Sequence, residues 1–107
     1  MQQDFEAVNN VDNGMPSGGS VDGVGLTIRW QNGPLGRGAE RIEPNGAFVE
    51  TVIAAALQRI EHYNETQFRC RENSLAITKL EEALHWLNAR TQRREVEGVE
   101  GTHGVDA

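Results

Sequence analysis

Apolar side chains recur every three or four positions through the second half of the chain. The longest such stretch runs from Arg71 to Glu97 and contains neither Gly nor Pro. It is rich in strong helix formers, and its aliphatic side chains fall on one stripe of a helix. These side chains are Ile77, Leu80, Leu84 and Leu87. The pattern therefore predicts a long helix that Gly98 ends.

A second amphipathic stretch runs from Ala47 to Tyr63, directly after Pro44-Asn45-Gly46. Its stripe consists of Val49, Val52, Ile53, Ala56, Leu57 and Ile60, which favours core packing. We expect Asn45 to be the N-cap. Only the segment from Asn64 to Cys70 separates the two stretches, which is enough for a turn between antiparallel helices. A helical hairpin is therefore expected over residues 47–97.

Upstream of this hairpin the pattern changes to alternation. Leu26, Ile28 and Trp30 alternate with polar residues, which is typical of a half-buried strand. Turn-forming residues follow, and a second, weaker extended segment is expected over residues 39–43. Two strands alone are barely stable, so they must pack on helices or pair with another subunit.

Residues 1–25 are low in apolar residues and dense in turn formers. We expect them to form a disordered arm. The rest, residues 26–107, is expected to be one domain with strands within 26–43, the hairpin at 47–97 and a Gly-rich tail at 98–107. The fold class is then α+β: a small antiparallel β-sheet packed with a two-helix antiparallel hairpin.

Length and charge narrow the possible functions. With 107 residues, the core is small enough to be marginal, so we expect an oligomer. Cys70 is the only cysteine, and with no signal peptide or long apolar run it indicates a reducing cytosol. A net charge of −6 argues against general binding to nucleic-acid backbones. The Lys and Arg residues concentrate between Arg59 and Arg94, a distribution that suits a small anion.

The chain contains no enzyme signature and no metal-ligand spacing among its histidines, so no catalytic residue, metal or cofactor is expected. The glycines of the tail are a weak phosphate-loop signal, because no strand precedes them. Arg90 and Arg94, four apart on one helix face, suit a phosphate or pyrophosphate. The alternative is a solvated helix end balanced by Glu95 and Glu97.

Aromatic and amide side chains gather at the bend of the hairpin, as stacking on a nucleobase and reading its edge require. They include Tyr63, Asn64, Gln67, Phe68 and Asn73. Alternatively, Phe68 packs beneath the bend and Asn73 caps the second helix. Asn73 and Arg90 are 17 residues apart, about 25 Å along a helix. A small nucleotide can therefore meet both only if two antiparallel hairpins share the site, which two-fold symmetry would duplicate.

These residues resemble a known family. The stretch YNETQFRCRENSLAITKLEEALHWLNARTQRREVEGVEGTH resembles the helical hairpin and tail of the phage Thoeris anti-defence sponge proteins. IRWQNGP and the helix start at Pro44-Asn45-Gly46 resemble their N-terminal strand region. The resemblance extends from near Leu26 to the end, and the hairpin is shared with anti-CBASS sponges, which bind cyclic oligonucleotides.

The resemblance implies a non-enzymatic protein that sequesters glycocyclic ADP-ribose signals made by bacterial TIR proteins and so blocks Thoeris immunity. It would act in the cytoplasm of the infected host. By the family motif, Tyr63 stacks on adenine, Asn73 is the polar residue of the site, and Arg90 and Arg94 hold phosphates. The tail that folds over the ligand is Gly98, Val99, Glu100, Gly101, Thr102 and His103. A further phosphate-contacting arginine before the first helix is either Arg37 or Arg41.

Three alternatives stay open at this point. They are a sponge for cyclic di- or trinucleotides of CBASS immunity, a ligand-free oligomerisation module, and an enzyme that cleaves the messenger. The lack of a nucleophile or metal motif counts against the enzyme. The expected partners are a cyclic ADP-ribose-type nucleotide, or cyclic oligonucleotides at separate sites, and further copies of the chain in a homodimer or homohexamer. No nucleic-acid polymer and no membrane is expected.

Overall fold

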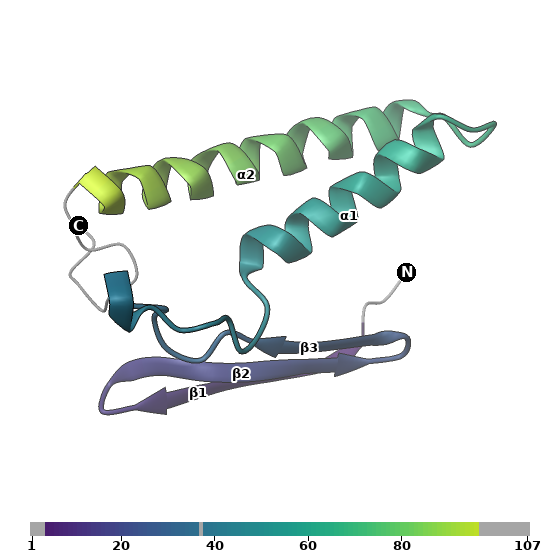
Figure 1. The fold of residues 1–107 in the computed structure, drawn as a ribbon. Coiled ribbons are helices and arrows are strands. Elements are labelled where there is room, and N and C mark those ends of the chain that lie inside the picture. Colours follow the sequence, from purple (N-terminus) through teal and green to yellow (C-terminus); the bar gives the residue numbers. More distant parts are fainter. Residues whose placement is uncertain (1–3, 37, 97–107) are drawn as a thin grey trace. The chain divides into compact units, whose positions relative to one another are not determined.

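The computed structural model describes residues 4–36 and 38–96, which form two compact units (Figure 1). The first unit contains three strands and a short 3-10 helix, and the second contains two α-helices. In chain order these elements are β1 (Phe5–Asp12), β2 (Met15–Gly23), β3 (Leu26–Trp30), η1 (Gly38–Glu40), α1 (Val49–Asn64) and α2 (Arg71–Val96). The predicted α+β class, with an antiparallel sheet and two helices, is confirmed.

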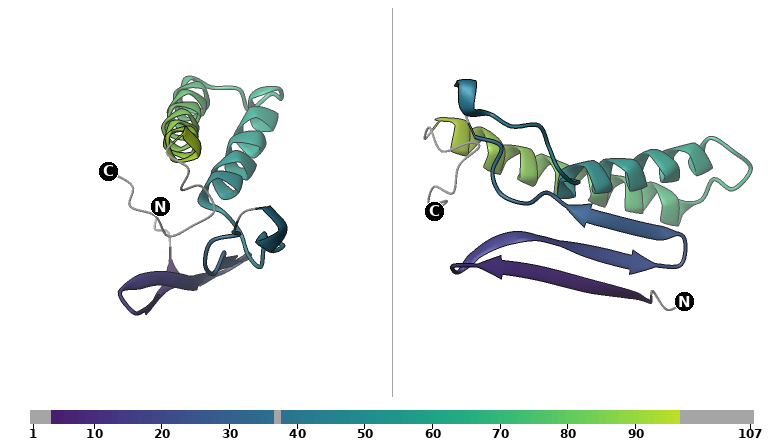
Figure 2. Two further views of the ribbon diagram at one scale, coloured as in Figure 1. Left: turned by 60° about the vertical axis from the view of Figure 1, so that its left-hand side comes forward. Right: turned by 60° about the horizontal axis from the view of Figure 1, so that its bottom comes forward.

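The sheet of the first unit has the order β1-β2-β3, and both pairs are antiparallel (Figure 2). Asn13 and Gly14 connect β1 to β2 with φ angles of 54° and 77°. Two successive positive φ angles are what a two-residue type I′ hairpin turn requires. Gly19 lies opposite Asn9, where an added Cβ would be 2.1 Å from the Val8 carbonyl oxygen. A glycine is therefore needed at this point of the strand.

The expectation of a disordered arm is wrong for residues 5–23, which form β1 and β2. Two features explain the difference. Asn13-Gly14 is a strong hairpin turn, and Gly19 and Gly23 of β2 allow the close approach of β1. Backbone pairing therefore forms strands although every residue of β1 is exposed. Residues 1–3 lie outside the described residues.

Strand β3 lies where the alternating pattern predicted one, but the extended segment expected over residues 39–43 is wrong. That region contains η1 and irregular chain, fixed by a hydrogen bond from Ile42 N to Leu35 O of 2.6 Å. The partner of β3 on that side is Ala47, which forms a parallel bridge with Trp30. Ala47 N donates to Arg29 O at 2.7 Å.

Asn45 is not a helix cap, because α1 begins only at Val49. Its side chain instead forms hydrogen bonds that stabilise the loop after β3. Asn45 Oδ1 accepts a hydrogen bond from Asn32 N at 2.7 Å, and Asn45 Nδ2 donates to Asn32 O at 3.1 Å. Asn45 N also donates to Gln31 Oε1 at 2.8 Å. The side chain that was expected to start a helix therefore closes a loop within the first unit.

In the second unit, α1 and α2 form an antiparallel hairpin joined by residues 65–70 (Figure 1). Their apolar stripes are the half-buried positions of the two helices. These are Val52, Ile53, Leu57 and Ile60 on α1, and Ala76, Ile77, Leu80, Ala83, Leu84 and Leu87 on α2. The apolar side chains spaced three and four residues apart therefore form the contact between the two helices.

Among the described residues no side chain is fully buried. Large apolar side chains stay exposed, among them Phe68 at 67% and Trp86 at 71%. A chain of this size gains its stability from buried apolar surface, and the described residues of the single chain bury little of it. Neither described helix is long and apolar enough to cross a membrane.

Candidate functional site

Tyr63 lies in the last turn of α1, at the bend of the hairpin, with 41% of its surface exposed. Arg59 precedes it by one helical turn. The Arg59 guanidinium carbon lies 4.9 Å from the centroid of the Tyr63 ring, and Arg59 Nε donates a hydrogen bond to the Tyr63 hydroxyl at 3.1 Å. The exposed aromatic ring expected at the bend is therefore present, and an arginine holds it.

Asn64 stabilises the bend that follows through hydrogen bonds of its side chain and its carbonyl oxygen. Its Oδ1 accepts a hydrogen bond from Cys70 N at 3.2 Å, and its Nδ2 donates to Ser74 Oγ at 3.1 Å. Arg69 Nε donates to the Asn64 carbonyl oxygen at 3.0 Å. These hydrogen bonds connect the end of α1 to the bend and to the first turn of α2. Tyr63 therefore lies next to a segment that several hydrogen bonds hold in place.

Cys70, not Asn73, caps α2. Cys70 Sγ accepts a hydrogen bond from Asn73 N at 3.4 Å, and Cys70 O accepts one from Ser74 N at 3.2 Å. Asn73 Nδ2 donates to Phe68 O at 3.2 Å, which leaves its Oδ1 without a donor among the described residues. The alternative in which Phe68 packs beneath the bend is wrong, because that side chain is 67% exposed. Asn73 Nδ2 is thus engaged at the bend, and no hydrogen bond to its Oδ1 forms among the described residues.

Arg90 lies near the opposite end of the hairpin. Its Nη2 is 3.9 Å from Oε1 of Glu50, in the first turn of α1. The Arg90 side chain is 49% exposed and that of Glu50 is 29% exposed. Arg94 is half-buried one turn further along α2. The carboxylate next to Arg90 thus comes from the other helix, where sequence reasoning had considered Glu95 and Glu97.

A single chain does not bring the two ends of the hairpin together. Asn73 and Arg90 belong to one continuous helix, α2, and their separation along it is about 25 Å by the helical rise. Figure 1 shows α2 running the whole length of the hairpin. The predicted tail residues, Gly98 to His103, lie outside the described residues, as does Arg37. Arg41 is exposed in the irregular segment after η1.

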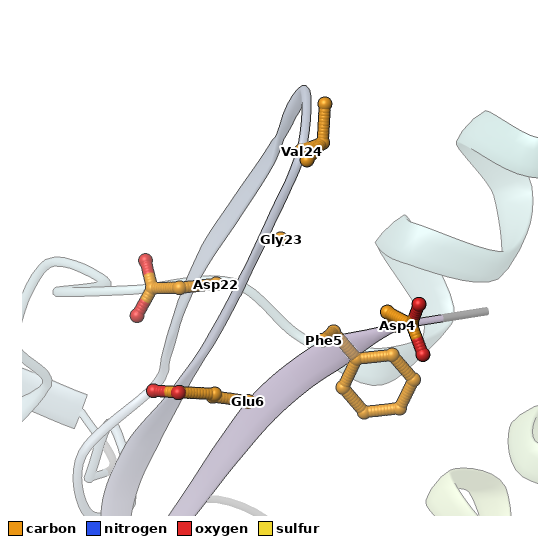
Figure 3. A pocket seen from close by; sticks show the side chains of 6 residues that line it. All are labelled: Asp4, Phe5, Glu6, Asp22, Gly23 and Val24. Carbon is orange, nitrogen blue, oxygen red and sulfur yellow. The ribbon is translucent and has the colours of Figure 1, made fainter.

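An open depression of about 560 Å³ lies in the first unit (Figure 3). Its lining consists of Asp4, Phe5, Glu6, Asp22, Gly23 and Val24. One of its three carboxylates, Asp22, is paired with Arg29 at 3.3 Å. The depression contains no predicted site residue, and its acidic lining is unsuited to a phosphate. Within the described part of the chain, no three His, Cys, Asp or Glu residues are placed to hold a metal ion.

Fold and side chains together define a small α+β protein whose helical hairpin has an aromatic and amide bend at one end and arginines at the other. Residues 22–92 match the model of the Acb2/Tad1 hairpin domain, and the chain belongs to this family. It is also 48% identical over 77 residues to "Thoeris anti-defense 1" of Bacillus phage SBSphiJ7. That alignment covers 72% of this chain and 51% of the relative, so the chain spans about half the length of the relative. The resemblance to the Thoeris anti-defence sponge family is therefore confirmed.

Proposed function

We propose that this protein is a sponge that binds and sequesters glycocyclic ADP-ribose signals of bacterial TIR proteins and thereby blocks Thoeris immunity. The observation that carries the proposal is the family match over residues 22–92, which includes Tyr63, Asn73 and Arg90. The identity to a phage protein named for Thoeris anti-defence supports the same assignment. The site of action is then the cytoplasm of the infected host, where such signals are made.

The chemistry of the two ends of the hairpin fits such a ligand. An adenine can stack on the exposed ring of Tyr63, a contact worth about 1–3 kcal/mol. The exocyclic amine of the adenine can donate to Asn73 Oδ1, which has no donor among the described residues. Arg90 and Arg94 would then hold the pyrophosphate, because guanidinium groups match phosphate oxygens in geometry and charge. The tail from Gly98 to His103 would cover the bound ligand.

We further propose that two chains share each site. With antiparallel hairpins, the bend of one chain meets the arginine end of its partner, and a two-fold axis creates two equivalent sites. The distance along α2 supports this arrangement, since about 25 Å separates Asn73 from Arg90. The exposed apolar surface supports association as well. Capture is stoichiometric, so its effect depends on affinity and copy number, whereas an enzyme would turn the messenger over.

The function is tested by incubating the purified protein with messenger from a TIR enzyme reaction, removing free ligand and heating the complex. Release of intact messenger is expected. An altered product would identify an enzyme, and the absence of retained ligand would refute both. Running cyclic di- and trinucleotides in parallel distinguishes the CBASS alternative.

The shared site is tested by co-expressing a Tyr63→Ala chain with an Arg90→Ala chain. Each variant alone should retain less messenger than the wild type. A mixed dimer, however, contains one site with both substitutions and one site with neither, so the mixture should recover part of the capacity. If both residues acted within a single chain, every chain in the mixture would be defective and no capacity would return.

A further inference from the structure

Arg59 makes two contacts with Tyr63 that sequence reasoning did not assign to the site. The guanidinium carbon lies 4.9 Å from the ring centroid, within cation–π range, and Nε donates to the hydroxyl at 3.1 Å. The residues are one turn apart on α1, so the helix itself sets their spacing. The neighbouring His62 ring is tilted by 47° with its centroid 6.2 Å away, so it is not stacked on Tyr63.

The two contacts fix different degrees of freedom of the tyrosine. The cation–π contact restricts the tilt of the ring, and the hydrogen bond restricts the position of the hydroxyl oxygen, so rotation about both side-chain torsions is restricted. An exposed aromatic side chain would otherwise lose that freedom only when the ligand binds, which weakens affinity. Because Nε reaches the hydroxyl, the guanidinium lies toward the hydroxyl end of the ring and leaves the rest of the ring surface to a base.

We propose that Arg59 is a positioning residue of the nucleotide site, which holds the Tyr63 ring in the orientation that receives the base. This inference rests on the proposed function, and it adds to it a residue that orients the aromatic ring. Because Arg59 acts through the ring, its effect on affinity should depend on the presence of an aromatic side chain at position 63. An arginine that contacted a phosphate directly would act regardless of the ring.

The first test measures calorimetric titration with purified TIR-derived messenger for Arg59→Ala and for a matched control, Lys79→Ala. Lys79 is a cation on the exposed side of α2, paired with Glu82 at 3.7 Å, and its loss changes the net charge equally. Arg59→Ala should weaken binding about two- to fivefold, the effect of an exposed cation–π contact, and Lys79→Ala should bind as the wild type does. Arg59→Lys, which keeps a cation over the ring, should recover most of the affinity.

The second test combines Arg59→Ala with Tyr63→Leu. In that background the arginine has no ring to hold, so its removal should cause no further loss. A full additional loss would show direct contact with the ligand and would overturn the positioning role. The side-chain Nε–H signal of Arg59 in NMR spectra should shift with Tyr63→Leu and remain unchanged with Lys79→Ala. An unshifted signal would also overturn it.

The outcomes separate this inference from the function on which it rests. If the wild-type protein retains no messenger, the sponge function is refuted and the role of Arg59 with it. If the wild type binds and Arg59→Ala binds equally well, only the role of Arg59 is refuted. Thermal unfolding of each variant without ligand shows whether any loss of binding comes from a damaged fold.

Discussion

Replacing Arg90 with alanine removes the guanidinium that lies 3.9 Å from Glu50. The ion pair joins the first turn of α1 to the later part of α2, so its loss can change the stability of the hairpin. Both side chains are partly exposed, Arg90 by 49% and Glu50 by 29%. Pairs of this kind contribute about 0–1 kcal/mol to the free energy of unfolding. Arg90→Ala should therefore leave the fold and the assembly intact.

Binding of the messenger should respond far more strongly. Truncating one partner of a buried, hydrogen-bonded charge pair costs about 2–5 kcal/mol, and every 1.4 kcal/mol is tenfold in Kd. The affinity of Arg90→Ala should then fall by about 30-fold to several thousand-fold. Titration calorimetry measures this change, and urea unfolding of the same samples measures the effect on stability.

Glu50→Gln is the matched control, because it breaks the same ion pair and keeps the guanidinium. Its free energy of unfolding should change as little as that of Arg90→Ala. Its affinity should equal the wild-type value or exceed it, since a carboxylate that would stand close to the ligand phosphates is gone. If the two variants weaken binding alike, Arg90 serves only to join the helices, and a phosphate contact is excluded.

Three further outcomes are expected. The protein should sediment as a dimer or a larger assembly at micromolar concentration, and a ligand-competent monomer would exclude a shared site. Tyr63→Ala should weaken binding about ten- to hundredfold in calorimetry, because it removes one stacking contact; unchanged affinity would place the base elsewhere. Gly19→Ala should destabilise the sheet by about 1–3 kcal/mol in thermal unfolding, since its Cβ would lie 2.1 Å from Val8 O. Val24→Ala, at a fully exposed position, is the control and should unfold as the wild type does.

The helical hairpin could be predicted because its signal is local. The stripe that includes Ile77 and Leu84 recurs at the helical period, and the half-buried positions of α2 follow it. Apolar content does not reveal the strands of residues 5–23, because every residue of β1 is exposed. Asn13-Gly14 was the available signal, and it specifies the hairpin through two positive φ angles.

The contacts around the candidate site differ in how far the sequence alone could indicate them, and the difference follows sequence distance. Arg59 and Tyr63 are four residues apart, so their contact was accessible from helical spacing alone. Glu50 and Arg90 are 40 residues apart, and their ion pair depends on how α1 and α2 align across the bend. That alignment is set by the length of residues 65–70 and by side-chain packing, which the one-dimensional pattern does not contain.

A ligand that contacts both Tyr63 and Arg90 must bridge two chains, so its binding is coupled to association. A ligand that binds the dimer and not the monomer stabilises the dimer, by about 2.7 kcal/mol per site when its free concentration is a hundredfold above Kd. The single chain has no fully buried side chain among its described residues, so in the proposed dimer association would provide burial that the monomer lacks. Messenger should therefore restore the dimer at protein concentrations where the free protein dissociates. In such a protein, each captured ligand also strengthens the assembly that retains it.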